Sequence, residues 1–267
     1  MAIVLPTKKQ QVLDYNPRLL VVYSKPKMGK STFCAALDDN LIIDLDKGGY
    51  RALEAMVVPA SSYTELREIA ISLDAKKKEL GKVPYRFITL DNSTHLEEYC
   101  LYYALLLYRQ TQQGKEFGNY TDKDGRNYTD KDGKTVFNTK ADVRQLPRGG
   151  GYLYVREAVK RAIEMFMPYC ETLILIGHVK DSLINKDGKE MSEMSLDLSG
   201  RLSDIICGDA DAVGFMRREG NQSIISFKTS GDLNKGARPK HLREKEFVVI
   251  EELENGELKV NTKEIFI

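Results

Sequence analysis

The stretch Ser24-Lys-Pro-Lys-Met-Gly-Lys-Ser31 decides how the rest of this 267-residue chain is interpreted. It fits the pattern G-x-x-x-x-G-K-[ST] at every fixed position except the first, where Ser24 replaces glycine. An apolar strand predicted at residues 19–23 precedes it, and a helix predicted at residues 31–37 follows. In that context the backbone N–H groups of the loop and of the helix N-terminus form a cradle for phosphate. We therefore predict a phosphate-binding loop rather than a chance Gly-Lys-Ser in a surface turn.

The predicted loop gives particular side chains a role in binding ATP and Mg²⁺. Lys30 is expected to reach the outer phosphates, and Ser31 to ligate the metal. Asp91 ends the apolar strand predicted at residues 85–90, and we expect it to hold Mg²⁺ from the adjoining strand. Its alternative role is to cap the next helix. Nucleotide contacts are expected along the whole loop, from Ser24, Lys25, Pro26, Lys27, Met28, Gly29, Lys30, Ser31 and Thr32.

The order of apolar runs predicts an α/β fold. Short apolar runs alternate with longer segments of helical period, which is typical of a mostly parallel sheet covered by helices. Strands are expected at residues 19–23, 41–45, 85–90, 172–176, 212–216 and 223–228, and helices at residues 31–37, 63–80, 94–108, 152–167 and 198–206. Residues 247–252 and 258–261 flank Asn255-Gly256, which predicts a C-terminal β-hairpin.

Composition limits the classes of function. Forty Lys and Arg balance thirty-nine Asp and Glu, so any binding of nucleic acid must be local. The four cysteines stand far apart without a C-x-x-C pair, which argues against a zinc site and fits a reducing cytoplasm. The apolar runs have the length of strands, so we expect neither export nor a membrane span.

With these pieces in order, the chain resembles the RecA-like P-loop ATPase core. It is more closely similar to the phage ATPases of the Sak-type single-strand annealing group, which are related to RecA and RadA. The resemblance covers roughly residues 18–238, and its motifs outside the phosphate loop are short. It implies a DNA-stimulated ATPase that binds single-stranded DNA in phage recombination, annealing or replication. It also implies a homo-oligomer, a ring or a filament, in the cytoplasm of the infected host.

The resemblance also implies catalytic residues. In the segment Leu41-Ile-Ile-Asp-Leu-Asp-Lys-Gly-Gly49, Asp46 aligns with the family carboxylate that positions the attacking water, and Asp44 is the less favoured neighbour. The alternative is that Asp46 and Gly48 form a turn. Asn92 offers no carboxylate after Asp91, so the base must come from elsewhere.

Two further residues are assigned by the same resemblance. His178 ends the strand Leu173-Ile-Leu-Ile-Gly-His178, where the family commonly has a glutamine that senses the γ-phosphate. Lys228, in Ile225-Ser-Phe-Lys-Thr, is the candidate for a basic residue supplied to the neighbouring subunit, with Arg238 as the second choice. For a lone histidine or an exposed lysine, a purely structural role is the alternative.

The chain is expected to divide into an N-terminal arm (1–17), an ATPase core (18–240) and the C-terminal hairpin (241–267). Residues 2–5 are a candidate edge strand for the next subunit. The two mobile DNA-binding loops of the family correspond to the polar insert at residues 110–151 and to residues 179–194. The insert repeats Tyr-Thr-Asp-Lys-Asp-Gly, predicting one or two hairpins or a mobile loop. It mixes aromatic with basic side chains, which suits stacking on bases, but a solvated hairpin is the alternative. The members of this mixture are Phe117, Tyr120, Tyr128, Phe137, Lys115, Lys123, Arg126, Lys131, Lys134, Lys140, Arg144 and Arg148.

Two other functions remain open from the sequence. A nucleotide or small-molecule kinase also uses a phosphate loop, and the insert at residues 110–151 would then act as its lid. A non-catalytic module that binds ATP without turning it over is the other alternative.

Overall fold

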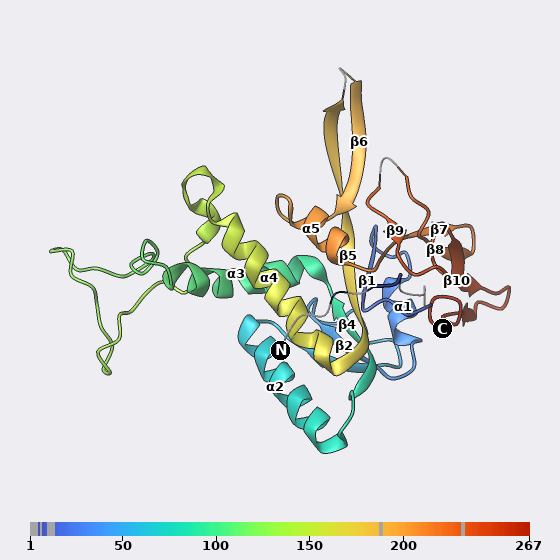
Figure 1. Ribbon diagram of the computed structural model, residues 1–267, viewed down its shortest axis with the longest axis horizontal. Helices are drawn as coiled ribbons and strands as arrows, with labels where there is room; N and C mark the ends of the chain where they lie inside the picture. Colours follow the sequence, from blue (N-terminus) through green and yellow to red (C-terminus); the bar gives the residue numbers. More distant parts are fainter. Residues whose placement is uncertain (1–4, 6, 10–13, 187–188, 231–232) are drawn as a thin grey trace.

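The computed structural model describes residue 5 and residues 7–9, 14–186, 189–230 and 233–267, with residues 182–186 and 189–193 described by their backbone alone. Within this part of the chain, eleven strands form one mixed sheet (Figure 1). The strands are β1 (Leu19–Ser24), β2 (Asn40–Asp44), β3 (Met56–Pro59), β4 (Tyr85–Asp91), β5 (Cys170–Lys186), β6 (Lys189–Leu196), β7 (Ala212–Glu219), β8 (Gln222–Ser226), β9 (Gly236–Ala237), β10 (Glu246–Glu252) and β11 (Leu258–Val260). The α-helices are α1 (Lys30–Ala35), α2 (Tyr63–Leu80), α3 (Ser93–Arg109), α4 (Tyr152–Phe166) and α5 (Leu202–Asp209).

The sheet is parallel in its larger part and antiparallel at its C-terminal side. Its order is β11-β10-β8-β7-β1-β5-β4-β2-β3, and the pairs from β7 to β3 are parallel. The predicted α/β class, the mostly parallel sheet and the C-terminal hairpin are confirmed. Strand β5 lies between β1 and β4. The prediction that Asp91 adjoins the strand of the phosphate loop is therefore wrong.

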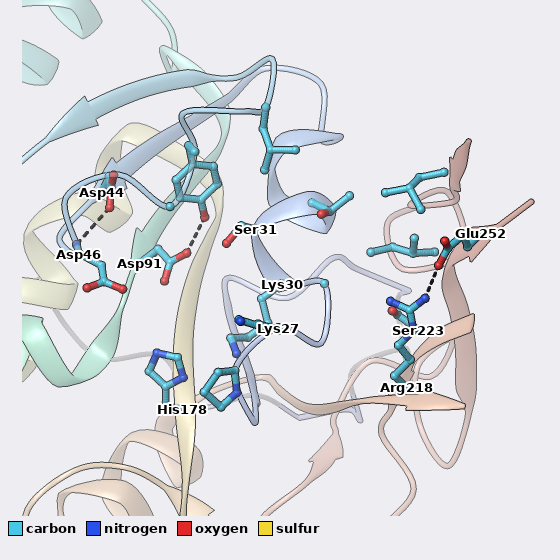
Figure 2. A pocket seen from close by; sticks show the side chains of 18 of the residues that line it. Lys27, Lys30, Ser31, Asp44, Asp46, Asp91, His178, Arg218, Ser223 and Glu252 are labelled. Atoms are coloured by element: carbon cyan, nitrogen blue, oxygen red, sulfur yellow. Dashed lines mark hydrogen bonds and ion pairs between the residues drawn. The ribbon is translucent and has the colours of Figure 1, made fainter. Parts of the chain in front are cut away.

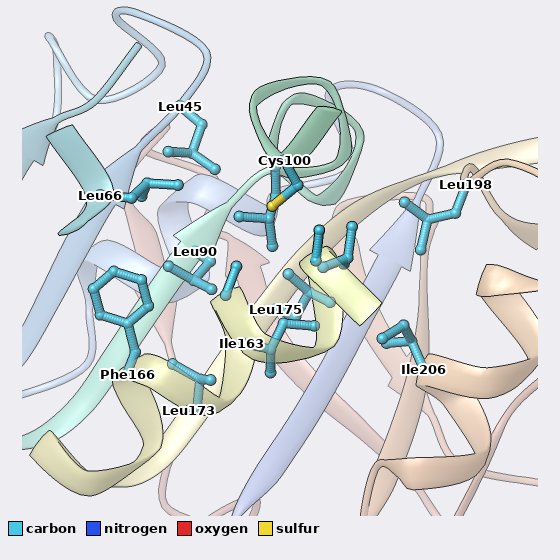
Figure 3. Close-up of a cluster of buried hydrophobic side chains, with 14 of the residues drawn as sticks. Leu45, Leu66, Leu90, Cys100, Ile163, Phe166, Leu173, Leu175, Leu198 and Ile206 are labelled. Atoms are coloured by element: carbon cyan, nitrogen blue, oxygen red, sulfur yellow. The ribbon is translucent and has the colours of Figure 1, made fainter. Parts of the chain in front are cut away.

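Both faces of the parallel strands are buried, because successive side chains point to opposite faces. On β1, Val21 packs in a core shared with α2, α3, α4 and α5, whereas Val22 packs in a second core with α1 and the C-terminal strands. Figure 3 shows the first core, in which Leu173 and Leu175 of β5 meet Ile163 and other helical side chains. This alternation produces the apolar runs that predicted the strands.

Strand β3 and helix α5 differ from the sequence prediction. The edge strand β3 was not predicted, since its four residues are mostly exposed and show no alternation of burial. Helix α5 begins at Leu202 instead of residue 198, because Gly200 has a positive φ of 56° and the chain turns there. The expected N-terminal strand at residues 2–5 lies outside the described residues except for Leu5.

The polar stretch predicted as a mobile loop at residues 179–194 is instead a long β-hairpin. Strand β5 leaves the sheet after His178, and from Val179 to Lys186 it pairs antiparallel with β6. The hairpin projects away from the sheet at the top of Figure 1. The Asp187-Gly188 pair in the sequence is a hairpin signal that would have predicted this element.

The insert at residues 110–151 projects from the end of α3 on the opposite side from the C-terminal strands (Figure 1). Isolated bridges join Thr121 to Asn127 and Thr129 to Thr135, so each copy of the repeat closes one tight turn. The insert then returns through two short 3-10 helices, η1 (Val143–Gln145) and η2 (Pro147–Gly149). A third, η3 (Met167–Tyr169), joins α4 to β5. In the described ranges no helix is long and apolar enough to cross a membrane.

Candidate nucleotide-binding site

A cavity of about 340 Å³ opens at the carboxyl ends of the parallel strands. The strand registers bring these ends together. Ser24 is opposite His178 on the neighbouring strand, and Asp44 is opposite Asp91. The phosphate loop leaves β1 at the same edge, where open α/β sheets bind their ligands. Figure 2 shows Lys30, Ser31, Asp91, Asp46 and His178 around this cavity.

The phosphate loop has the backbone geometry that its sequence requires at two positions. Lys27 and Gly29 have positive φ values of 63° and 104°. A Cβ atom on Gly29 would lie 2.7 Å from Cδ1 of Ile250, so both the conformation and the space require glycine. Ser24, by contrast, is the last residue of β1. The departure from glycine at that position is therefore tolerated, because the residue lies in a strand.

Lys30 is 7% exposed, and its ammonium group is held by the loop itself. Nζ donates hydrogen bonds to Oγ of Ser24 at 2.8 Å and to the carbonyl oxygen of Lys25 at 3.1 Å. Burial lowers the pKa of Lys30, while the carboxylate of Asp91 opposes this shift. A buried cation at the end of the loop is the group that a phosphate loop needs for its outer phosphates.

Asp91 is 9% exposed and faces the same cavity. Burial raises its pKa, whereas the hydroxyl of Tyr50, which donates a 2.6 Å hydrogen bond to Oδ2, acts in the opposite direction. The helix-cap alternative does not hold for Asp91, because the side chain of Asn92 caps α3 by accepting from the backbone N–H of His95. Tyr50 was not predicted at the site, and nothing in the sequence around it signals the contact.

Asp44 and Asp46 have different roles in the loop after β2. The carboxylate of Asp44 is buried and accepts hydrogen bonds from the backbone N–H groups of Asp46 and Gly48, at 3.0 and 2.8 Å. Asp44 thus holds the turn that was the alternative role considered for Asp46. The side chain of Asp46 is 55% exposed, lines the cavity, and lies 3.8 Å from Nε2 of His95.

His178 lies on the strand between the phosphate loop and Asp91. Residues 174, 176 and 178 alternate on the face that packs against α1, so the imidazole points into the cavity. Nδ1 is buried and has no hydrogen-bond partner among the described residues. Burial and, next, the charge of Lys30 lower the pKa of His178. His178 was predicted to end its strand, but β5 continues past it into the hairpin.

The basic residues expected to act on a neighbouring subunit lie outside this cavity. Lys228 is exposed and forms a 2.9 Å ion pair with Glu246, whose pKa falls to about 2 through hydrogen bonds from Lys228, Ser226 and Arg217, that from Lys228 having the largest effect. Arg238 pairs with Asp211 and donates to the carbonyl oxygen of Gly208.

Several residues of the cavity wall were missed by sequence reasoning because they come from strands distant in the chain. Of the nine loop residues predicted to contact nucleotide, Pro26, Lys27, Gly29, Lys30, Ser31 and Thr32 line the cavity, and Ser24, Lys25 and Met28 do not. The opposite wall is formed by Arg218, Asn221, Ser223, Ile250, Glu252 and Leu258. No motif marks these positions, and only the pairing of β7, β8, β10 and β11 collects them.

The residues fit Mg²⁺ and a nucleoside triphosphate. A buried lysine and the glycine-dependent turn face the cavity, and the unpartnered Nδ1 of His178 provides a further polar group. Ser31 and Asp91 offer the oxygen ligands that Mg²⁺ prefers. Fold and site together define a P-loop nucleoside-triphosphate-binding protein.

Comparison with known proteins agrees with this class. A family model described as an AAA domain matches residues 16–238. The chain therefore belongs to this family of AAA-type P-loop ATPases. A search of curated proteins finds no match to the chain.

Proposed function

We propose that this P-loop ATPase binds single-stranded DNA and uses the state of its nucleotide to control its hold on the strand, in phage recombination, annealing or replication. The observation that carries the proposal is the position of His178. It lines the nucleotide cavity, is the last residue of β5 paired with β1, and directly precedes the β5–β6 hairpin. A change at the outer phosphates therefore has a short covalent path to a projecting element.

In the proposed mechanism Lys30 would bind the outer phosphates, and Ser31 and Asp91 would hold Mg²⁺, whose charge would offset that of the phosphates. Asp46 accepts a proton from the attacking water and orients it, since its carboxylate is not used by the turn. Burial and the charge of Lys30 lower the pKa of His178, which favours the neutral imidazole. Its ring then donates a hydrogen bond to the terminal phosphate through one nitrogen only.

The insert supplies the second proposed DNA contact. Tyr120 and Tyr128 are 50% and 55% exposed and stand at equivalent places in the two repeats. Exposed aromatic rings among lysines stack on bases while the cations neutralise phosphates. Phe117 and Phe137 instead pack at the base of the insert, where the guanidinium of Arg109 lies 3.9 Å from the centre of the Phe137 ring.

Two of the acidic residues of the insert have a structural use that is compatible with this role. Oδ1 of Asp122 accepts from the backbone N–H groups of Asp124 and Arg126. Asp130 makes the same two bonds in the second repeat, to Asp132 and Lys134. These two carboxylates build the tight turns that carry the tyrosines and lysines, so their presence does not argue against DNA binding.

The proposal also includes assembly of several copies. Lys228 or Arg238 would then reach the phosphates of the neighbouring subunit, as both are exposed and belong to no cavity wall of their own nucleotide site. The particle size in the presence of ATP and DNA tests this part.

The DNA half of the proposal is tested by the rate of ATP hydrolysis without DNA, with duplex DNA and with single-stranded DNA. We expect single-stranded DNA to increase the rate about tenfold or more, because ordering of the DNA-binding elements would complete the catalytic geometry. The variant Tyr120→Ala with Tyr128→Ala should keep the rate without DNA and lose most of the increase. Equal rates in all three conditions would leave an ATPase without a DNA partner.

A further inference from the structure

The C-terminal strands provide a second wall of the nucleotide cavity. Its members are Arg218, Ser223, Ile250, Glu252 and Leu258, which we call the C-terminal wall. Strand pairing explains why they meet. Ser223 is opposite both Arg218 and Ile250, and Glu252 is opposite Leu258. Directly opposed residues, and residues two apart on a strand, point to one face of a sheet, so all five side chains share a face.

The same face continues into the protein core. Met216, two residues before Arg218, is fully buried in the cluster that contains Phe33 of α1. The sheet face that packs beneath α1 therefore extends past the start of this helix and becomes the cavity wall. It lies against the phosphate loop, since a Cβ on Gly29 would come 2.7 Å from Cδ1 of Ile250 and 3.1 Å from Oγ of Ser223.

The two ends of the cavity differ in the groups that they offer to a ligand. Lys30 and the Mg²⁺-binding oxygens lie at one end, and Glu252 and Leu258 lie at the other (Figure 2 labels all but Leu258). The carboxylate of Glu252 is already paired with the guanidinium of Arg218, so the C-terminal wall offers no free cation to a phosphate. Leu258 is 51% exposed, which leaves an apolar surface for a ligand at this end. A nucleotide is therefore oriented with its phosphates toward Lys30 and its uncharged nucleoside toward the C-terminal wall.

We infer that the C-terminal wall is the nucleoside subsite, in which Ile250 and Leu258 pack against the base and Glu252 accepts hydrogen bonds from the ribose hydroxyls. This inference rests on the proposed binding of ATP at the phosphate loop. The guanidinium of Arg218 binds Oε2 of Glu252 and orients the carboxylate. Oε1 has no hydrogen bond to the described residues and can accept from a ligand.

The subsite predicts selectivity between ribonucleotides and deoxyribonucleotides. A carboxylate that accepts from the 2′-hydroxyl loses this bond with dATP. Calorimetric titrations with ATP, dATP and inorganic tripolyphosphate, each with Mg²⁺, measure the contributions of hydroxyl and nucleoside. We expect the wild-type chain to bind ATP about fivefold more tightly than dATP, and to bind both more tightly than tripolyphosphate.

Two substitutions separate the parts of the subsite. Glu252→Ala should abolish the preference for ATP over dATP. Leu258→Ala should weaken ATP and dATP alike by about fivefold without changing the affinity for tripolyphosphate, and Leu258→Met should restore the affinity. Glu251→Ala is the matched control, since Glu251 is the neighbouring carboxylate, lines no part of the cavity and pairs with Gln222.

The results of these titrations distinguish a failure of the nucleoside subsite from a failure of the proposed ATP binding at the phosphate loop. Equal affinities of the wild-type chain for ATP and dATP would show that Glu252 does not bind the ribose 2′-hydroxyl. A Leu258→Ala variant that loses tripolyphosphate affinity as much as ATP affinity shows that the wall supports the loop and does not bind the nucleoside. A chain that binds none of the three ligands contradicts the nucleotide site itself.

Discussion

Lys30 and Asp91 carry opposite charges in one buried corner, and burial shifts the pKa of each toward its neutral form. Each charge opposes the shift of the other. The hydroxyl of Tyr50 adds a hydrogen bond to the ionised carboxylate, the form that binds metal. Tyr50 is therefore a positioning residue for Asp91.

The variant Tyr50→Phe tests this role. Loss of the hydrogen bond favours protonation, so the pKa of Asp91 rises further. The acid limb of the pH profile of Mg²⁺-dependent ATP hydrolysis should then move to higher pH by about one unit. Tyr99→Phe is the control, because its hydroxyl donates to the carbonyl oxygen of Leu45 and not to a carboxylate. An acid limb at the same pH in Tyr50→Phe and the wild-type chain would show that Tyr50 does not stabilise the ionised carboxylate of Asp91.

Some residues of the site could be predicted from the sequence, and others could not. Lys30, Ser31 and Asp91 belong to a local motif or end an apolar run, and the structure brings them to one cavity. The use of Asp44, and not Asp46, to hold the turn depends on backbone N–H directions within that turn. Tyr50 and Glu252 contact the site through folding of distant segments, which no local pattern encodes.

The β5–β6 hairpin is the element that joins the cavity to the surface. Gly177 is needed at its base, because a Cβ there would lie 2.1 Å from Cδ1 of Leu196 on β6. The backbone N–H of Asp197 also donates to the carbonyl oxygen of His178 at 2.9 Å. Both ends of the hairpin are therefore fixed beside the residue proposed to sense the terminal phosphate.

A shortened hairpin tests whether this element is needed for stimulation by single-stranded DNA but not for ATP hydrolysis itself. Residues 184–191 are replaced by Asn-Gly, so that the pair Leu183 and Ser192 closes a two-residue turn. We expect unchanged ATP hydrolysis without DNA, because no residue of the cavity is removed, and loss of most of the stimulation by single-stranded DNA. Full stimulation in the shortened chain would assign DNA binding to another element. Circular dichroism controls for folding.

The elements that the sequence failed to predict share a physical reason. Strand β3 is a short edge strand, and residues 179–194 have no apolar run long enough to predict a buried strand. Patterns of hydrophobicity report burial, so elements that bury little leave no pattern. The strands between the two cores bury both faces and were predicted with small errors at their ends, except that β5 continues to Lys186.

In the whole molecule, the antiparallel C-terminal strands extend the parallel sheet and form part of the nucleotide cavity. The expected division at residue 240 set β10 and β11 apart as a C-terminal hairpin. Strand β10 pairs with β8 within the main sheet, and Ile250 contacts the phosphate loop. A deletion of the last strands would therefore disturb the nucleotide site as well as the core.

Binding and hydrolysis of ATP in the cavity beside Lys30 is the step on which the proposed function depends. Its most direct test is steady-state hydrolysis of Mg²⁺-ATP by the wild-type chain, Lys30→Ala and the control Lys78→Ala, whose exposed side chain pairs with Asp74 on α2. We predict wild-type turnover in the control and a loss of about a hundredfold or more in Lys30→Ala, since the terminal phosphate loses its buried cation. Turnover by Lys30→Ala equal to that of the wild-type chain would contradict the account.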